Sequence, residues 1–146
     1  MSLHDGFNHS TEVEVRFHDL DALGHVNNAR YLNYLEQARL AYATEVCGWD
    51  GTLRTLGLIV ANVTIDFKQP IFLGDKLEIA TRASRLGNKS FDLEYRFITT
   101  RPPASAALAG EAKTTLVTYD YSEGKTVPIF TAWREAMLAH EPALIA

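Results

Sequence analysis

A short polar segment holds most of the side chains in this chain that could carry out acid–base or nucleophilic chemistry. Two carboxylates, two imidazoles and two carboxamides lie between His18 and Asn28. A carboxylate in such a segment is able to attack a thioester carbon or to activate water. Taken alone, Asp19 and Asp21 are more typical of side chains that brace a turn by accepting backbone N–H bonds. The residue types therefore permit hydrolysis without establishing it.

The elements on either side place this segment between a strand and a helix. Thr11 to Phe17 alternates between apolar and polar residues, which predicts a strand with one covered face. Helical spacing of apolar residues from Tyr31 to Tyr42 predicts a helix of about four to five turns, with Gly48 as its stop. Asn27 and Asn28 are candidate N-caps. The first turn of this helix exposes backbone N–H groups at the positive end of the helix dipole, which suits it to hold an oxyanion.

The rest of the chain is dominated by strand-forming residues. Four runs separated by turn residues are expected to pair as an antiparallel meander. These runs are Leu58 to Lys68, Lys76 to Leu86, Phe91 to Thr100 and Ala106 to Tyr119. Helical spacing returns from Thr131 to His140 and predicts a short terminal helix. The order predicts an α+β fold, in which the long helix lies across an antiparallel sheet of about five strands.

One long helix covers only part of a sheet of this size. Apolar surface and unpaired strand edges are therefore left for a second copy of the chain to cover. We expect a homo-oligomer, either a homodimer or a homotetramer. No linker, repeat or low-complexity segment divides the 146 residues, which predicts a single domain.

The composition argues against several classes of function. With 14 Lys and Arg against 18 Asp and Glu, the net charge is −4, so the chain lacks the basic surface that nucleic acid requires. No segment is long and apolar enough to span a membrane, and residues 1–10 do not resemble a secretory signal. The single Cys47 excludes an internal disulfide and favours a reducing, cytoplasmic location. The five His residues form no paired ligand spacing, which predicts that no metal is bound.

Two sequence patterns make the chain similar to a known family. Residues Asp21 to Tyr31 follow the pattern Asp-x-x-Gly-His-Val-Asn-Asn-x-x-Tyr, and Asp66 to Leu77 contains a Pro followed by a Gly-Asp turn. Together they resemble the hotdog-fold thioesterases related to 4-hydroxybenzoyl-CoA thioesterase and the long-chain acyl-CoA thioesterases. The resemblance extends from about Glu12 to Tyr119. It implies a hotdog fold, with the sheet wrapped around the long helix, and hydrolysis of acyl-CoA thioesters without a cofactor.

Carried over residue by residue, the resemblance implies roles for the polar segment. Asp21 matches the catalytic aspartate, as nucleophile or general base, and Asp19 matches its support. The N–H group that polarises the thioester carbonyl is expected from the Asn27–Ala29 region. The polar side chains expected around the thioester are His25, Asn27 and Asn28. Glu36 is a reserve candidate, because some hotdog thioesterases use a carboxylate on the helix.

Further residues are predicted to bind the substrate. Tyr31 is expected to reach the acyl chamber, although its aromatic stripe is also typical of core packing. Arg82, Arg85 and Lys89 flank the turn between two central strands, where relatives bind the nucleotide end of coenzyme A. A solvated hairpin tip explains these three cations equally well. The apolar helix face favours an apolar or aryl acyl group.

Other functions remain compatible with the same residues. The thioester could be carried by an acyl carrier protein, whose phosphopantetheine arm would enter the same tunnel. The chain could also be a non-catalytic acyl-CoA binding module, because a fold does not guarantee chemistry. A hotdog dehydratase fits less well, because the loop is of the thioesterase type. Asp21→Asn separates an enzyme from a binding module, since only the enzyme should lose turnover.

Overall fold

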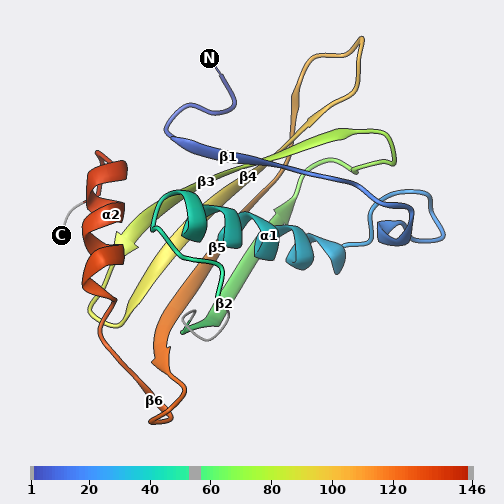
Figure 1. Ribbon diagram of the computed structural model, residues 1–146. Coiled ribbons are helices and arrows are strands. Elements are labelled where there is room, and N and C mark those ends of the chain that lie inside the picture. The colour runs from blue at the N-terminus through green and yellow to red at the C-terminus, as the bar shows by residue number, and fades with distance from the viewer. Residues whose placement is uncertain (1, 53–56, 145–146) are drawn as a thin grey trace.

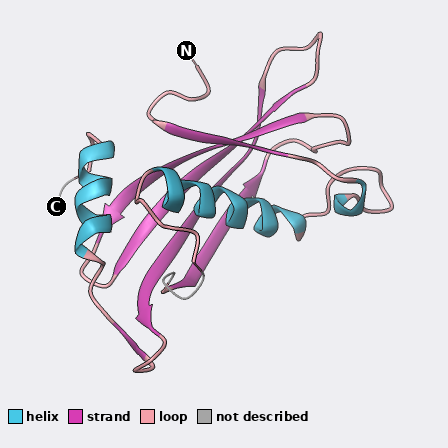
Figure 2. Cartoon of the chain, viewed as in Figure 1, coloured by secondary structure: helices cyan, strands magenta, loops and turns pink. Residues whose placement is uncertain are grey.

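The computed structural model describes residues 2–52 and 57–144, which form one six-stranded sheet and two helices (Figure 1; Figure 2). The chain begins with strand β1 (His9–Val13), a 3₁₀ turn at Phe17–Asp19 and helix α1 (Arg30–Glu45). The later elements are β2 (Leu58–Phe67), β3 (Lys76–Leu86), β4 (Ser90–Thr100), β5 (Ala107–Asp120), the short β6 (Lys125–Thr126) and helix α2 (Thr131–His140). The predicted α+β class is confirmed, and α2 has the predicted bounds.

The main path of the sheet runs in the order β1-β3-β4-β5-β2, with every neighbouring pair antiparallel. Strands β3, β4 and β5 form the predicted meander, but β2 does not belong to it. β2 pairs with β5, at the edge opposite to β1. The link between β2 and β3, residues 68–75, is too long for a tight hairpin, and β1 occupies the free edge of β3. The prediction of a four-strand meander was therefore wrong for β2.

Helix α1 lies across one face of the sheet, as Figure 1 shows. Its buried residues are Tyr31, Tyr34, Leu35, Ala38, Tyr42 and Ala43. They belong to the same hydrophobic core as side chains at alternate positions of the central strands, including Leu77, Ile79, Leu93, Tyr95 and Phe97. Burial of apolar surface at roughly 25 cal/mol per Å² is the main term that holds helix and sheet together. The helix is thereby fixed along its whole length.

Local chemistry closes both ends of α1. Beyond its C-terminal end, Gly48 has a φ of +73°, and the N–H of Trp49 donates to a carbonyl of the last turn at 2.9 Å. This left-handed cap confirms the predicted stop. At the other end, the helix begins at Arg30 with Ala29 as N-cap, so the prediction that Asn27 or Asn28 is the N-cap was wrong. The Asn27 carboxamide oxygen instead accepts the N–H of Ala29 at 2.9 Å, in a turn just before the helix.

The first strand is displaced from its predicted range, Thr11 to Phe17. β1 covers His9–Val13 and ends beside the start of its partner β3, so the following residues lack a strand to pair with. The N–H of Arg16 donates to the Asp19 carboxylate at 3.0 Å instead. Phe17, predicted on the covered face, is 77% exposed. The alternating pattern therefore continues beyond the part of the chain that pairs.

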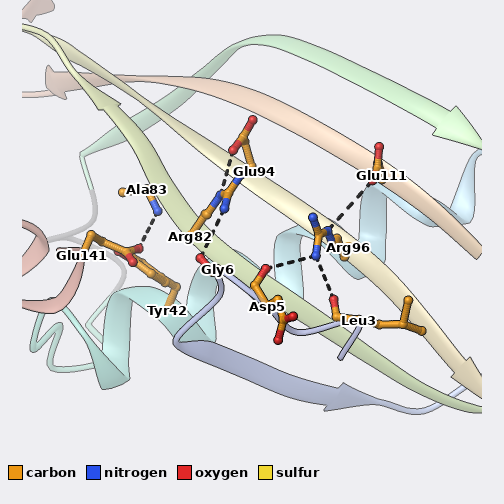
Figure 3. Close-up of polar contacts among 10 residues, drawn as sticks. All are labelled: Leu3, Asp5, Gly6, Tyr42, Arg82, Ala83, Glu94, Arg96, Glu111 and Glu141. Carbon is orange, nitrogen blue, oxygen red and sulfur yellow. Dashed lines mark hydrogen bonds and ion pairs between the residues drawn. The ribbon is translucent and has the colours of Figure 1, made fainter. Parts of the chain in front are cut away.

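One buried carboxylate ties the C-terminal end of α2 to α1 and β3. Glu141 is 4% exposed and accepts the Tyr42 hydroxyl at 2.9 Å and the N–H of Ala83 at 2.6 Å (Figure 3). Ala83 lies at an irregularity in the β3–β4 register, typical of a bulge, where a backbone N–H is available to another acceptor. Both bonds offset the free-energy cost of burying this carboxylate.

The face of the sheet turned away from α1 carries charges of alternating sign. Arg82, Glu94 and Lys113 are paired across β3, β4 and β5. The Phe7 ring lies on this face, with its centroid 4.3 Å from the guanidinium carbon of Arg82 and 4.6 Å from that of Arg96. These contacts hold the segment before β1 against the sheet. In the two described ranges of the chain, no helix has the length and apolar character needed to cross a bilayer.

Candidate active site

Residues 18–28, named here the site loop, are held between the first turn of α1 and the link from β2 to β3. Leu20 pairs with Val26, and His25 pairs with Phe72, as isolated bridges. The N–H of Val26 donates to the carbonyl of Ile71 at 2.8 Å. These bonds bring the two predicted sequence patterns into contact and fix the loop beside the helix N-terminus.

Asp19 supports the site loop from inside. It is 3% exposed, and its Oδ2 accepts the hydroxyl of Tyr34 at 2.7 Å and the N–H of Arg16 at 3.0 Å. Its backbone carbonyl accepts the N–H of Asn27 at 2.8 Å. Burial, the hydrogen bond and the charge of Asp19 raise the pKa of Tyr34, so this phenol remains a proton donor. Asp19 therefore connects the loop to the core through α1.

Asp21 lies on the outer part of the loop with one oxygen bound and one open. Oδ1 accepts the N–H of Leu23 at 2.9 Å, which is the turn-bracing role that the residue type alone favours. Oδ2 lies 3.8 Å from Nδ1 of His25, and the two side chains are 28% and 33% exposed. Gly24 completes the turn with a φ of +86°, a conformation that favours glycine. Oδ2 is thus the oxygen available for chemistry.

The predicted Asn27–Ala29 region contains one open backbone donor. The N–H of Asn27 binds the carbonyl of Asp19, and that of Ala29 binds the carboxamide oxygen of Asn27. Among the residues that the structure describes, no group accepts the N–H of Asn28. Because Asn28 precedes α1 by two residues, this donor lies at the positive end of the helix dipole. It has the character expected of an oxyanion donor.

A cavity of about 210 Å³ lies beside the site loop and the start of α1. Its wall includes His25, Asn28 and Tyr31 from the loop and helix, with Phe67 and Lys68 from the end of β2. The Tyr31 ring packs against Phe67 at a centroid distance of 4.8 Å, and burial raises the pKa of Tyr31 to about 12. The cavity therefore combines polar groups near the helix start with an aromatic wall. Asp21 is not part of this wall. Its carboxylate lies 3.8 Å from the ring of His25, which is part of it.

The three cations predicted to bind the nucleotide lie elsewhere in the chain. Arg82 donates through Nε to Glu94 at 2.8 Å, and Arg85 binds Asp92 through Nε and Nη2 at 3.0 Å and 3.1 Å (Figure 3 shows the first pair). Lys89 is exposed in the β3–β4 hairpin. At about 3.3 Å per residue, Arg82 and Arg85 lie roughly 20 and 30 Å along β3 from its start near the site. Within one chain, these residues are not brought to the cavity, and their role stays a prediction.

The reserve candidate Glu36 is exposed on α1 about two turns beyond Asn28. It lines a different cavity, of about 320 Å³, with Arg39, Leu40 and Val60. The two cavities share no wall residue. Glu36 is thus separated from the open N–H of Asn28 and from the Asp21–His25 pair.

Sequence reasoning missed three residues that shape this site. Tyr34 belongs to the aromatic stripe of the helix, which is typical of core packing, but its hydroxyl holds Asp19. Phe67 and Phe72 lie within the second pattern, Asp66 to Leu77, but were given no role, and only the three-dimensional contacts place them at the loop. The signal available in the sequence for Tyr34 was the residue type itself. A Tyr on the apolar stripe of a helix carries a hydroxyl that needs a partner when it is buried.

The structure also bears on metal binding. Within residues 2–52 and 57–144 there is no group of three or more His, Cys, Asp or Glu side chains placed to hold a metal ion. The expectation of a metal-free site stays a prediction.

Comparison with known proteins shows which family the chain resembles. The family model described as "Thioesterase-like superfamily" matches residues 15–137. The long-chain acyl-CoA thioesterase FadM of Escherichia coli K12 is 31% identical over 137 residues, which cover 87% of this chain and 95% of FadM.

Solved structures give the same picture. A thioesterase from Thermus thermophilus, crystallised with coenzyme A and Zn, is 34% identical, with a TM-score of 0.81 over 94% of this chain and 98% of that one. 4-Hydroxybenzoyl-CoA thioesterase from Pseudomonas sp. strain CBS-3 is 21% identical, with a TM-score of 0.79 over 87% of this chain and 96% of that one, and supports the predicted hotdog fold. The chain belongs to the thioesterase-like superfamily.

Proposed function

We propose that the protein hydrolyses acyl-CoA thioesters to a carboxylic acid and free coenzyme A. The observation that supports this most directly is the N–H of Asn28, which has no acceptor among the described residues and belongs to a residue in the same cavity wall as His25, the neighbour of Asp21. An electrophile-binding donor and a carboxylate with a free oxygen are the two groups that such a hydrolysis needs. The activities named for FadM and the Thermus enzyme are consistent with it.

In the proposed reaction the thioester carbonyl oxygen accepts the N–H of Asn28. Oδ2 of Asp21 then either attacks the carbonyl carbon or takes a proton from a water that attacks it. The first route gives a mixed anhydride that water hydrolyses, and the second gives the acid directly. In both routes the carbon–sulfur bond breaks, and coenzyme A leaves as a thiol after protonation. No cofactor or metal is part of this scheme, because the carboxylate and the N–H supply the base and the electrophilic contact.

The acyl group is proposed to lie against the aromatic wall. Tyr31 contacts Phe67 and Phe97, at centroid distances of 4.8 Å and 5.0 Å. Phe67 is 46% exposed in the single chain, so its ring is available for further contact. An apolar or aryl acyl group would bury this surface, whereas a charged group would lose hydration against the two rings.

A homodimer is proposed to complete the site. Within the described ranges β2 pairs with β5 alone, so no strand of these ranges pairs with its other edge. Exposed apolar residues of β2 are Ile59, Val60, Val63 and Phe67. An unpaired strand with apolar residues is a natural pairing surface for a second copy of the chain. Because Phe67 belongs both to β2 and to the cavity wall, pairing there would also cover the open side of the cavity.

Asp21→Asn tests the catalytic assignment. The carboxamide oxygen is able to keep the bond from the N–H of Leu23, so the loop should remain folded. We expect kcat for acyl-CoA hydrolysis, measured by thiol release, to fall at least about 100-fold while acyl-CoA still binds. Asp120→Asn, at the far end of the sheet, is the matched control and should retain wild-type turnover.

The outcomes separate the competing functions. Unchanged kcat in Asp21→Asn would contradict the role of Asp21. Tight acyl-CoA binding by the wild-type protein, without hydrolysis of any acyl length or aryl group, would indicate a binding module. Faster turnover of the same acyl group on acyl carrier protein than on coenzyme A would assign the other carrier.

A further inference from the structure

A second cavity adjoins the candidate active site. It has a volume of about 190 Å³, and its wall combines residues of the link from β2 to β3 with residues of the β4–β5 hairpin, residues 101–106. Gln69 and Pro70 belong to the walls of both cavities. A ligand that extends from the first cavity over these two residues therefore enters the second.

One arginine of the second cavity is fixed at its stem and open at its tip. Nε of Arg101 lies 2.6 Å from Oδ1 of Asp75, and the other oxygen of Asp75 accepts the N–H of Phe72 at 2.9 Å. The Asp75 side chain is 4% exposed, whereas that of Arg101 is 53% exposed. Nη1 and Nη2 of Arg101 have no acceptor within the described part of the chain. This geometry presents two N–H₂ groups to a ligand from a guanidinium that is already oriented.

A phenylalanine links this arginine to the candidate active site. The guanidinium carbon of Arg101 lies 4.5 Å from the centroid of the Phe72 ring, which lies 6.4 Å from the centroid of His25. The two separations together limit the distance between the guanidinium and the His25 ring to about 11 Å. Arg101 is therefore close to the thioester site within one chain.

Arg82 and Arg85 lack this combination. Arg82 uses Nε for Glu94 and Nη1 for the carbonyl of Gly6, and Arg85 uses Nε and Nη2 for Asp92. A phosphate that binds Arg82 or Arg85 would compete with these existing hydrogen bonds. At Arg101 it would add to them, because only Nε is engaged.

We propose that Arg101 binds the phosphate of the phosphopantetheine arm, which crosses Gln69 and Pro70 from one cavity to the other. The proposal rests on the proposed thioesterase function and assigns its carrier-binding residue. The shared ligand chemistry is a phosphoryl group esterified to pantetheine, which is part of a diphosphate in coenzyme A and of a phosphodiester in acyl carrier protein.

The test compares substrates that differ in this phosphate. Wild type, Arg101→Gln and Arg101→Lys are assayed with one acyl group on coenzyme A, on acyl carrier protein and on pantetheine, which has no phosphate. Gln is able to keep a hydrogen bond to Asp75, so the hairpin should stay in place. We expect Arg101→Gln to raise KM for acyl-CoA about tenfold, with KM for acyl-pantetheine unchanged. Arg101→Lys should raise KM for acyl-CoA less than Arg101→Gln does, because Lys keeps the positive charge but not the paired N–H donors.

A control removes one exposed positive charge from the opposite end of the sheet. Lys125→Gln should leave KM for every substrate unchanged. Equal rises in KM for acyl-CoA and acyl-pantetheine in Arg101→Gln would overturn the proposal, as would a selective rise in Arg85→Gln but not in Arg101→Gln. A selective rise with acyl carrier protein alone would support the phosphate contact and identify that carrier as the source. Failure of the wild-type protein to hydrolyse any of the three substrates would instead contradict the proposed function.

Discussion

Replacing Tyr34 with Phe should separate the stability of the fold from the positioning of the site loop. Tyr34 and Asp19 are 1% and 3% exposed, and the hydroxyl donates to the carboxylate at 2.7 Å. The variant keeps the aromatic packing and removes one of the two described hydrogen bonds to this carboxylate. The N–H of Arg16 remains as the other donor.

The expected magnitude follows from that contact. A hydrogen bond to a charged group contributes about 1.5–3 kcal/mol, and here its loss leaves a buried carboxylate less satisfied. We therefore expect Tyr34→Phe to lower the free energy of unfolding by about 2 kcal/mol and the melting temperature by about 4–8 °C. A shift of the site loop by about 1 Å should also lower kcat by roughly 10- to 100-fold, because Asp21 follows Asp19 closely in the chain.

Tyr42→Phe is the matched control for this prediction. Tyr42 is also on α1, is 2% exposed and donates to a buried carboxylate, Glu141, at 2.9 Å. Its bond holds the C-terminal end of α2 instead of the site loop. Urea or thermal unfolding should therefore show similar destabilisation for the two variants, while thiol release from acyl-CoA should show loss of kcat in Tyr34→Phe only.

Two outcomes would contradict this prediction. Equal kcat values for the two variants, measured well below both melting temperatures, would show that the bond between Tyr34 and Asp19 does not position the site. A stability loss below about 0.5 kcal/mol in both variants would contradict the assigned strength of these buried bonds.

Two further measurements test the charge pairs and the sheet edge. Burial alone would raise the pKa of Asp92, but hydrogen bonds from Arg85 and Thr115 outweigh it and hold this pKa below its usual value. The ionised form therefore stabilises the fold at neutral pH. Asp92→Asn should lower the free energy of unfolding, measured in urea at several pH values, by about 1–3 kcal/mol at pH 7 and by progressively less below about pH 4. A difference in this free energy between wild type and variant that does not change with pH would count against the prediction. Val63→Lys should shift the proposed dimer to monomer in size-exclusion chromatography with light scattering, and an unchanged mass would place the interface elsewhere.

Local sequence signals predicted most of the strand and helix bounds. The ends of β3, β4 and β5 lie within one residue of the prediction, because alternation and the Gly-Asp and Gly-Asn turns act locally. The partner of β2 was not predictable in this way. The pairing of β2 depends on which edge of the sheet remains free after β1 has paired with β3. Residues 58–67 carry no local signal for that edge.

The site was predictable where it is contiguous in sequence. Asp21 lies 3.8 Å from His25, and His25 lines the cavity together with Asn28, because one short loop carries all three. Arg101 was not predicted, because its place beside Phe72 depends on the β4–β5 hairpin returning to the link from β2 to β3. Positive charge and the resemblance to relatives favoured the arginines of β3, whose carboxylate partners become evident only from the strand register.

The turn around Asp21 has an evolutionary consequence. Its shape depends on an oxygen that accepts the N–H of Leu23 and on the positive φ of Gly24, and neither requires a charge. An amide at this position would preserve the turn and the neighbouring cavity. A single-codon change is thus sufficient, on the proposed mechanism, to turn a hydrolase of this architecture into a carrier that sequesters thioesters intact. Descendants of a duplicated gene could diverge in this way without refolding.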